Sequence, residues 1–591
     1  MSLDKIRNIA IIAHVDHGKT TLVDGFLRQT GIFRDNEDVQ TCVMDSNDLE
    51  RERGITIIAK NTAITFKEHL INIVDTPGHA DFGGEVERVL NMVDGCLLIV
   101  DAFDGPMPQT RFVLRKALAQ NLNPIVVINK VDRQNINPHD AIDKVFDLFV
   151  ELGANNEQLN FPYIFCSGLK GWATREENAV GENLNPLLDL IIEHCPAPIG
   201  NIEEPFSMRV NIIDYNDYLG RIAIGRVFNG EITTNSSVVL HTEGDKKIRG
   251  RITKLYTFHG LKKIESQSAS CGEIIALAGF PQCQIGDSIT FNEETIALDR
   301  IDVEEPTVKM SFLVNNSPLA GTEGKYVTSR NLKDRLYREL ETNVSLRVED
   351  TDNTDTFLVS GRGELHLAIL IETMRREGFE FQVSRPEVIY KEKNGIQYEP
   401  YETLLIDVPD DYLGPVMQEL GQRKAEIVNM ESNGKQSYVS AMIPTRGLIG
   451  FASRYLRITR GNGVMNHTFE EYRPYSGELS FKRNGALIAY EAGLATYYAL
   501  EQTSDRGVFF ISPGTKVYSG MIIGENNRVQ DLEINICKTK KLTNIRSSNQ
   551  EVLVHLSAPQ EMTLEDCLEY IASDELLEIT PQNIRMRKMK I

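Results

Sequence analysis

The sequence has few cysteines, no long apolar run near its start and no excess of positive charge, and each absence excludes a class of protein. Its eight cysteines are scattered without pairing patterns, which is typical of reduced thiols in a cytosol and not of a disulfide framework. The apolar run IAIIA at residues 9–13 is too short for a secretion signal or a membrane span. We therefore expect a cytoplasmic protein with no membrane partner.

The net charge limits how this chain could bind nucleic acid. The 591 residues carry a formal net charge of −21, which argues against nucleic acid wrapped over the whole surface and gives no reason to expect a DNA partner. Local basic patches could still dock onto RNA while the rest of the surface stays acidic. Because a single hydrophobic core stops growing well before this length, the chain should form several domains.

The first informative motif is AHVDHGKT at residues 13–20, which lies between a buried-strand pattern and a helix pattern. The backbone N–H groups of such a turn and the positive end of the helix dipole favour an anion. Lys19 can reach the β- and γ-phosphates of a nucleotide, and the Thr20 hydroxyl is placed to bind Mg²⁺. The strict phosphate-loop pattern has glycine in place of Ala13, and a methyl group there is tolerable while φ stays negative. A chance Gly-Lys-Thr at a helix start is the alternative.

The second motif, DTPGH at residues 75–79, follows the strand pattern LINIV. Asp75 at the strand end can hold Mg²⁺ through its water shell, and the Gly78 N–H can approach the γ-phosphate because no side chain obstructs it. Between the two motifs lies RERGITI, in which Thr56 is the natural switch residue, since it could bind Mg²⁺ only while the γ-phosphate is present. A solvated charged turn is the alternative interpretation of RERG.

The third motif, NKVD at residues 129–132, indicates which base is bound. Asp132 can accept hydrogen bonds from guanine N1–H and from its 2-amino group, whereas adenine offers neither donor. We expect Asn129 to brace the surrounding loops and the alkyl stem of Lys130 to cover the base.

The fourth motif, CSGLK at residues 166–170, closes the predicted pocket with Ser167 and Gly168. The Gly168 N–H should be available to the guanine carbonyl oxygen. The order of the four motifs matches successive strand ends of a doubly wound sheet. The nucleotide site expected from these motifs comprises Asp16, His17, Gly18, Lys19, Thr20, Thr21, Gly78, Asn129, Lys130, Asp132, Ser167, Gly168 and Leu169, with Thr20, Thr56 and, through water, Asp75 at the metal.

His14 and His17 are spaced like metal ligands, and His79 could join them. No Cys-x-x-Cys or His-x-x-x-His pattern accompanies them, and both lie inside the predicted phosphate loop. We therefore favour a nucleotide site over a zinc site.

The motifs AHVDHGKT, RGITI and DTPGH resemble those of the translational GTPases, the elongation factors that act on ribosomes. The resemblance implies that His79 orients the attacking water when ribosomal RNA positions it. It also implies that Val15 and Ile55 form the apolar pair flanking this histidine and that Asp16 is the phosphate-loop aspartate. Hydrolysis should be slow when the protein is alone, because phosphoryl transfer depends on positioning and charge stabilisation.

Beyond the nucleotide domain the expected fold is multidomain, α/β followed by α+β. Short β-rich stretches separated by glycine turns favour a small barrel, and two strand–helix–strand–strand–helix–strand patterns favour tandem split βαβ units. His366, at the head of the second helix of the first unit, is expected to be a packed or capping side chain. The expected domains are a P-loop GTPase domain at 1–199, a translation-factor β-barrel at 200–302, ferredoxin-like α+β modules at 303–393 and 394–480, and a C-terminal domain at 481–591.

GRGELHLAIL at residues 361–370 is similar to elongation factor G, but that similarity ends after Glu478. From Phe481 onward, and above all in KLTNIRSS at residues 541–548, the sequence resembles the C-terminal domain of the BipA family, also called TypA. This resemblance implies a ribosome-associated GTPase that uses GTP, GDP and Mg²⁺, acts in large-subunit assembly and supports growth under cold or other stress. It implies contact with both ribosomal subunits, ribosomal RNA and transfer RNA; we expect a monomer.

Two other functions remain open at this point. The chain could be an RNA-binding assembly module that nucleotide gates without required turnover. It could also be a translocation factor like elongation factor G, although it lacks that protein's fourth-domain tip.

A cationic segment at residues 538–546 is the main candidate for RNA contact, because a dense group of cations can neutralise several phosphates. A solvated charge run is the alternative, and resemblance to the BipA family favours RNA. The terminal run of Arg585, Arg587, Lys588 and Lys590 is a second, weaker candidate, because chain ends are often merely solvated. The residues of the main segment are Lys538, Lys540, Lys541, Asn544 and Arg546.

Overall fold

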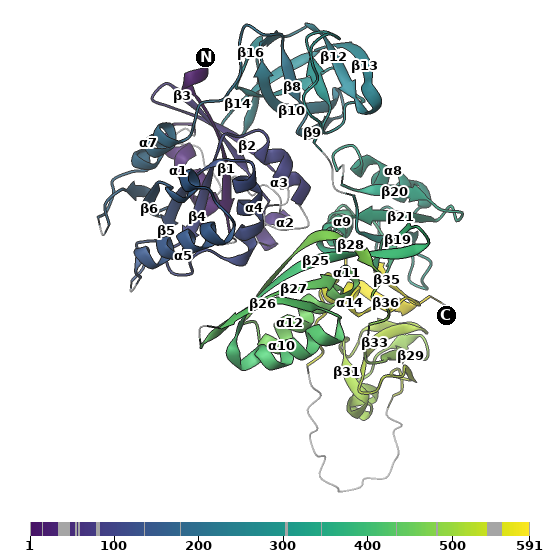
Figure 1. Ribbon diagram of the computed structural model, residues 1–591. Helices are drawn as coiled ribbons and strands as arrows, with labels where there is room; N and C mark the ends of the chain where they lie inside the picture. The colour runs from purple at the N-terminus through teal and green to yellow at the C-terminus, as the bar shows by residue number, and fades with distance from the viewer. Residues whose placement is uncertain are drawn as a thin grey trace, which may run out of the picture. The chain divides into compact units, whose positions relative to one another are not determined.

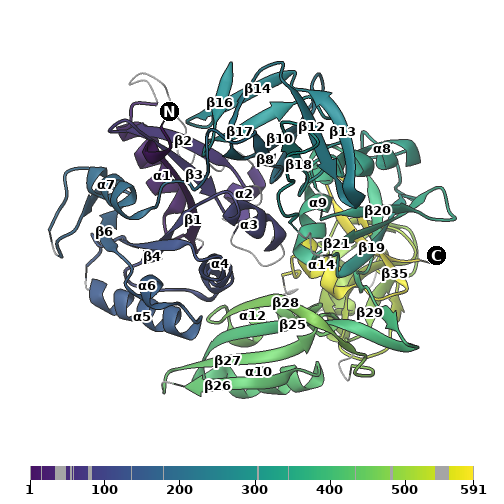
Figure 2. The same ribbon diagram turned by 45° about the horizontal axis from the view of Figure 1, so that its top comes forward.

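The computed structural model forms two compact units (Figures 1 and 2). The first contains residues 1–305 and 341–345, and the second contains residues 306–340 and 346–591. Among the described residues, none of the helices has the length and hydropathy needed to span a lipid bilayer. The structure describes residues 2–14, 16–32, 48–53, 56, 59–77, 83–134, 136–177, 179–301, 305–343, 345–432, 434–479, 483–539 and 558–589.

The first unit begins with a seven-stranded sheet in the order β2-β3-β1-β4-β5-β6-β7. The five central strands are parallel, and β2 and β7 are antiparallel at the edges. The strand order reverses beside β1, so the carboxyl ends of β1, β3 and β4 meet where ligands bind in doubly wound sheets. The strands are β1 (Ile6–Ala13), β2 (Asn61–Phe66), β3 (His69–Asp75), β4 (Gly95–Asp101), β5 (Asn123–Asn129), β6 (Tyr163–Ser167) and β7 (Trp172–Thr174).

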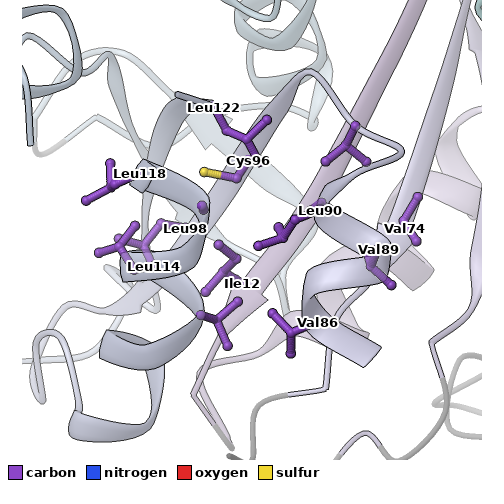
Figure 3. Packing of buried hydrophobic residues seen from close by; sticks show 14 of the residues in the cluster. Ile12, Val74, Val86, Val89, Leu90, Cys96, Leu98, Leu114, Leu118 and Leu122 are labelled. Carbon is purple, nitrogen blue, oxygen red and sulfur yellow. The ribbon is translucent and has the colours of Figure 1, made fainter. Parts of the chain in front are cut away.

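Helices cover both faces of this sheet because side chains alternate along each buried strand. Ile9 and Ile11 of β1 pack with α1 and α7 on one face, while Ala10 and Ile12 pack with α3, α4 and α5 on the other. Figure 3 shows Ile12 among side chains of α3 and α4, such as Val86 and Leu114. The helices are α1 (Lys19–Gln29), α2 (Asp48–Arg53), α3 (Gly83–Leu90), α4 (Pro108–Ala119), α5 (Pro138–Glu151), α6 (Asn156–Leu159) and α7 (Asn185–His194), with a 3₁₀ turn at Leu3–Lys5.

An antiparallel β domain follows and packs directly on the nucleotide domain. Its strands run β13-β12-β18-β8-β10-β17-β14-β15, with β9 beside β10 and a separate β11–β16 pair, and they enclose one core. Ile224 and Ile274 belong to the same buried cluster as Val86 and Val89 of α3, so one core continues from the sheet into the β domain. The strands are β8 (Ser207–Arg209), β9 (Ile212–Asn216), β10 (Gly220–Asn229), β11 (Glu231–Thr233), β12 (Ser237–Thr242), β13 (Lys246–Arg251), β14 (Lys254–His259), β15 (Lys262–Glu265), β16 (Ser268–Ser270), β17 (Ile274–Ala278) and β18 (Ser288–Thr290).

The second unit opens with the predicted strand–helix–strand–strand–helix–strand order. His366 is buried in the second helix, as a packed side chain would be. These elements are β19 (Val308–Val314), α8 (Ser329–Glu339), β20 (Arg347–Asp350), β21 (Thr356–Gly361), α9 (Glu364–Arg376) and β22 (Phe381–Ser384), followed by the short β23 (Glu387–Val388).

A second α+β module repeats this pattern, again as predicted. Its sheet has the order β24-β25-β27-β26 with β28 on the other side of β25, and α10 and α12 supply side chains to one core with β25 and β27. The elements are β24 (Lys391–Lys393), β25 (Ile396–Pro409), α10 (Asp410–Gln422), β26 (Glu426–Ser432), β27 (Gln436–Pro444), α11 (Thr445–Leu448), α12 (Phe451–Thr459) and β28 (Val464–Pro474).

The last segment of the chain does not form a sheet of its own. Strand β35 pairs with β22, with Val383 opposite Leu577, so a single eleven-stranded sheet contains strands from both ends of the second unit. Leu577 shares a core with Phe312 and Phe381. The elements are β29 (Ala486–Ala489), β30 (Gly493–Leu494), α13 (Tyr497–Gln502), β31 (Gly507–Phe509), β32 (Lys516–Val517), β33 (Met521–Asn526), β34 (Leu532–Ile534), α14 (Leu564–Tyr570), β35 (Glu575–Ile579) and β36 (Ile584–Lys588).

Candidate nucleotide-binding site

The turn between β1 and α1 has the geometry of an anion cradle. Gly18 has φ +92° and would place a Cβ 2.4 Å from Asn129 Nδ2, so a side chain there would fill the space and strain the backbone. No side chain caps α1, which begins at Lys19, and the first N–H groups of a helix have no partner within it. Ala13 ends β1 and is not among the residues with positive φ, so its methyl group is tolerated as expected. A phosphate group fits this turn.

Asn129 holds three loops together. Its Nδ2 donates to the carbonyl oxygen of His17 at 2.7 Å, and its Oδ1 accepts from the Gly168 N–H at 2.9 Å. The side chain is 1% exposed. This is the bracing that the sequence predicts for Asn129. The sequence predicts that the Gly168 N–H is available to a guanine carbonyl oxygen. In this structure the N–H donates to Asn129 Oδ1 instead, because the loop after β6 lies against the Asn129 side chain.

Lys19, Thr56 and Asp75 meet at the end of β3, although they are far apart in the sequence. The Lys19 ammonium lies 2.6 Å from Asp75 Oδ1 and also donates to Thr56 Oγ1, while Thr56 Oγ1 lies 3.4 Å from Asp75 Oδ2. Thr56 and Asp75 are both buried. Hydroxyl and carboxylate oxygens are the ligands that Mg²⁺ prefers, so this donor set would fit that metal.

Asp132 lies at the base-recognition loop as a charged acceptor. Burial raises the pKa of this carboxyl, but hydrogen bonds from Ser167 and Lys170 outweigh that effect and leave the pKa below its ordinary value. Lys170 Nζ lies 3.3 Å from Asp132 Oδ2, and Ser167 is fully buried. An ionised carboxylate held in this way can accept hydrogen bonds from a base.

Four other predicted nucleotide-site residues are half-buried or exposed. Thr20 and Thr21 are half-buried in the first turn of α1, and Leu169 is 85% exposed after β6. Asp16 is exposed, with φ +63°.

His17 lies buried at the end of β4, with 5.1 Å between its ring centroid and that of His14. It is 2% exposed, and burial lowers its pKa to about 4. Its Nδ1 lies 3.3 Å from the Asp101 backbone nitrogen and 3.4 Å from the Ile99 carbonyl oxygen, so the ring is bonded to the end of β4, and its low pKa keeps it neutral. Sequence reasoning did not point to Asp101.

Lys590 of the terminal basic run lies outside the described part of the chain, as do eight predicted site residues: Val15, Ile55, Gly78, His79, Lys540, Lys541, Asn544 and Arg546. Lys538, at the start of the basic segment, is described and exposed.

Within the part of the chain that the structure describes, the terminal basic run is not a free cationic surface, which corrects the second RNA candidate. Arg585 pairs with Glu323 and Glu578, and Lys588 pairs with Asp531, Asp574 and Glu575. Arg587 is buried at 3% exposure. Arg585 and Lys588 therefore neutralise carboxylates in and beside the eleven-stranded sheet, because β36 lies within that sheet.

The doubly wound sheet, the glycine cradle and the loops joined by Asn129 define a guanine-nucleotide-binding GTPase with the multidomain architecture of the translational GTPases. Family models match in the same order along the chain. They are the elongation factor Tu GTP-binding domain at residues 4–197, elongation factor Tu domain 2 at 220–290, elongation factor G domain III at 325–385, the elongation factor G C-terminus at 396–483 and the TypA/BipA C-terminal domain at 484–591.

The chain belongs to the TypA/BipA family. A Synechocystis relative is 58% identical, with 99% of this chain and 98% of the relative covered. Relatives from Bacillus subtilis (52% identical; 99% and 96% covered) and Escherichia coli K12 (51%; 99% and 97%) are similar over the same extent. All three are described as "Large ribosomal subunit assembly factor BipA". A crystal structure of a protein from Thermus thermophilus shares the fold at 18% identity and a TM-score of 0.56, covering 80% of this chain and 98% of its own.

Proposed function

We propose that this protein is a ribosome-associated GTPase that binds the ribosome in its GTP form, hydrolyses GTP there and assists assembly of the large subunit. The contact of Lys19 with Thr56 and Asp75 carries the proposal, because it gathers the phosphate-binding lysine, the switch threonine and the strand-end aspartate at one point. The printed descriptions of the relatives support the ribosomal part.

Each loop has one role in this proposal. Gly18, Lys19 and the start of α1 bind the phosphates, Asp132 accepts from guanine, and Lys130 covers the base. Thr20, Thr56 and, through water, Asp75 would hold Mg²⁺, which would neutralise charge that develops on the phosphate oxygens. With Lys19 on the phosphates, Thr56 and Asp75 would hold Mg²⁺ in place of its ammonium. Hydrolysis then removes the contact that keeps Thr56 in place.

We propose that His79 activates GTP hydrolysis and that Val15 and Ile55 form the apolar pair flanking it. A residue that orients water is sufficient for phosphoryl transfer, so we propose that ribosomal RNA positions His79 and that the isolated protein is slow. The test compares GTP hydrolysis with and without ribosomes for the wild type, His79→Ala and His139→Ala, an exposed histidine of the same domain. We expect stimulation to be lost only in His79→Ala.

Growth complementation separates turnover from simple gating by nucleotide. If hydrolysis ends ribosome binding, His79→Ala should remain bound with GTP and should not rescue a deletion strain in the cold. Rescue equal to wild type would favour an assembly module that needs no turnover.

The segment at Lys538, Lys540, Lys541, Asn544 and Arg546 is the proposed contact with ribosomal or transfer RNA, within a C-terminal domain at 481–591. Replacing Lys540 and Lys541 by alanine should weaken ribosome binding, while nucleotide affinity stays unchanged. Ribosome affinity should also depend less steeply on salt concentration, by the amount expected for the loss of roughly two phosphate contacts. Unaltered ribosome affinity would identify the segment as solvated surface.

A further inference from the structure

Asp101 is a fully buried carboxylate at the carboxyl end of β4, beside the nucleotide loops. It is 0% exposed. Its Oδ2 lies 2.8 Å from Lys130 Nζ and 3.2 Å from Arg133 Nη1, and its Oδ1 accepts from the Phe103 N–H at 2.8 Å. Burial raises the pKa of this carboxyl, but the bonds from Lys130 and Phe103 and the nearby charges outweigh burial and leave the pKa lowered. The group is therefore a fixed negative charge.

Lys130 bridges Asp101 and the phosphate loop. Its ammonium donates to the carbonyl oxygen of Asp16 as well as contacting Asp101. Both Lys130 and Asp16 have φ +63°, a left-handed conformation that is uncommon outside glycine and that persists only where the surroundings enforce it. A lysine held at both its backbone and its ammonium has a restricted alkyl stem.

Asp101 also contacts the phosphate loop directly through its backbone, because its N–H donates to His17 Nδ1. One residue of β4 thus touches the phosphate loop through His17 and the base loop through Lys130. A buried ion pair is by itself weak evidence for stability, and Asp94 shows the contrast. Asp94 pairs with Arg226 at 2.7 Å and joins the sheet to the β domain, remote from these loops.

We infer that Asp101 is a positioning residue for guanine-nucleotide binding, which fixes the Lys130 side chain across the phosphate loop so that its stem can cover the base. The inference rests on the proposed function, since it assigns a partner to a residue of that same site. Asp101 touches no reacting atom, so it should govern how long nucleotide stays bound and not how fast bound GTP is cleaved.

The experiment is a double-mutant cycle on the full chain with a fluorescent N-methylanthraniloyl GDP as the probe. Asp101→Asn should speed GDP release about tenfold, as expected when a charged hydrogen bond is lost, and should raise KM for GTP while kcat at saturating GTP stays within about twofold. In a Lys130→Met background, the same Asp101→Asn change should alter GDP release less than about twofold, because its effect passes through the lysine.

Two further variants guard the interpretation. Asp101→Ser removes the carboxylate but keeps a smaller hydroxyl oxygen that can accept a hydrogen bond, so it should reproduce the faster release even if Asp101→Asn folds poorly. Asp94→Asn is the matched control, and we expect a lower melting temperature with unchanged GDP release.

Additive effects of Asp101→Asn and Lys130→Met, or a release rate equal to wild type, would overturn the inference and leave the proposed function standing. A wild-type protein that binds no fluorescent GDP would instead remove the proposed function itself.

Discussion

Replacing Asn129 by alanine removes both hydrogen bonds that join the phosphate loop to the loop after β6. It leaves the His17 carbonyl and the Gly168 N–H without the partner they have at 2.7 and 2.9 Å. Each lost bond costs about 1 kcal/mol net, and a buried group left without a partner costs about 1–3 kcal/mol. The loop arrangement should therefore lose about 2–4 kcal/mol.

That loss should appear in nucleotide affinity, because the two bonds hold the loops in the arrangement that binds nucleotide. Since 1.4 kcal/mol is about tenfold in an equilibrium constant, GDP affinity should fall by at least about 30-fold in a fluorescence titration. Hydrogen exchange at the Gly168 amide should also accelerate, which locates the change.

Two variants give this prediction its controls. Asn129→Asp keeps an acceptor for Gly168 but loses the donor to His17, so Gly168 should stay protected while GDP affinity still falls. Asn211→Ala removes a comparably buried bond, from Asn211 Nδ2 to the Arg88 carbonyl at 2.9 Å, and should leave GDP affinity unchanged. A change in GDP affinity below about threefold in Asn129→Ala would refute the reasoning.

Three other predictions concern the base, acidity and the long sheet. Asp132→Asn should weaken GTP binding by at least about 100-fold and favour xanthine nucleotides, because an amide donor replaces an acceptor. An unchanged preference for GTP over xanthine nucleotides in competition assays would mean that the base pocket is not at Asp132. Burial lowers the pKa of His17 from 6.5 to about 4, so between these two pH values the unfolded state binds more protons than the folded state. The free energy of unfolding should therefore fall by about 3 kcal/mol as the pH drops through this range. In urea unfolding, His17→Asn should show a weaker pH dependence than wild type, and an equal pH dependence of the two proteins would contradict this. Leu577→Ala should cost about 3 kcal/mol and speed hydrogen exchange in β22 as well as β35; protection lost in β35 alone would mean that the strands do not share a core.

The nucleotide domain could be predicted from sequence because its signals are local. The motif containing Lys19 follows a buried strand directly, and Asp75 and Asn129 each stand at a strand end, so the parallel sheet brings them together. The strand and helix order of the two α+β modules was also readable, since each element carries its own periodicity.

Asp101 could not be found in this way. Its segment, LLIVDAFDGP, looks like the end of a buried strand followed by a turn, and nothing local shows that Lys130 turns back across the phosphate loop. That path depends on the left-handed φ of Lys130 and Asp16, and such φ values are chosen by tertiary context in residues other than glycine.

The C-terminal cations were misread for a related reason. Lys588 and Arg585 resemble a solvated basic tail because the fold that brings their acidic partners to them is not visible in the sequence, whether the partner is distant like Glu323 or nearer like Glu578. The pairing of β35 with β22 is equally non-local, and no pattern within either strand identifies the other.

That pairing has a consequence for how the protein is made. Strand β22 ends at Ser384 and β35 begins at Glu575, so nearly two hundred residues separate neighbours in the sheet. At about 5–20 residues per second, a ribosome needs on the order of 10–40 s to supply the missing strand. Throughout that interval the nascent chain presents an open strand edge, which makes β22 a natural place for a chaperone to bind and for newly made chains to pair wrongly.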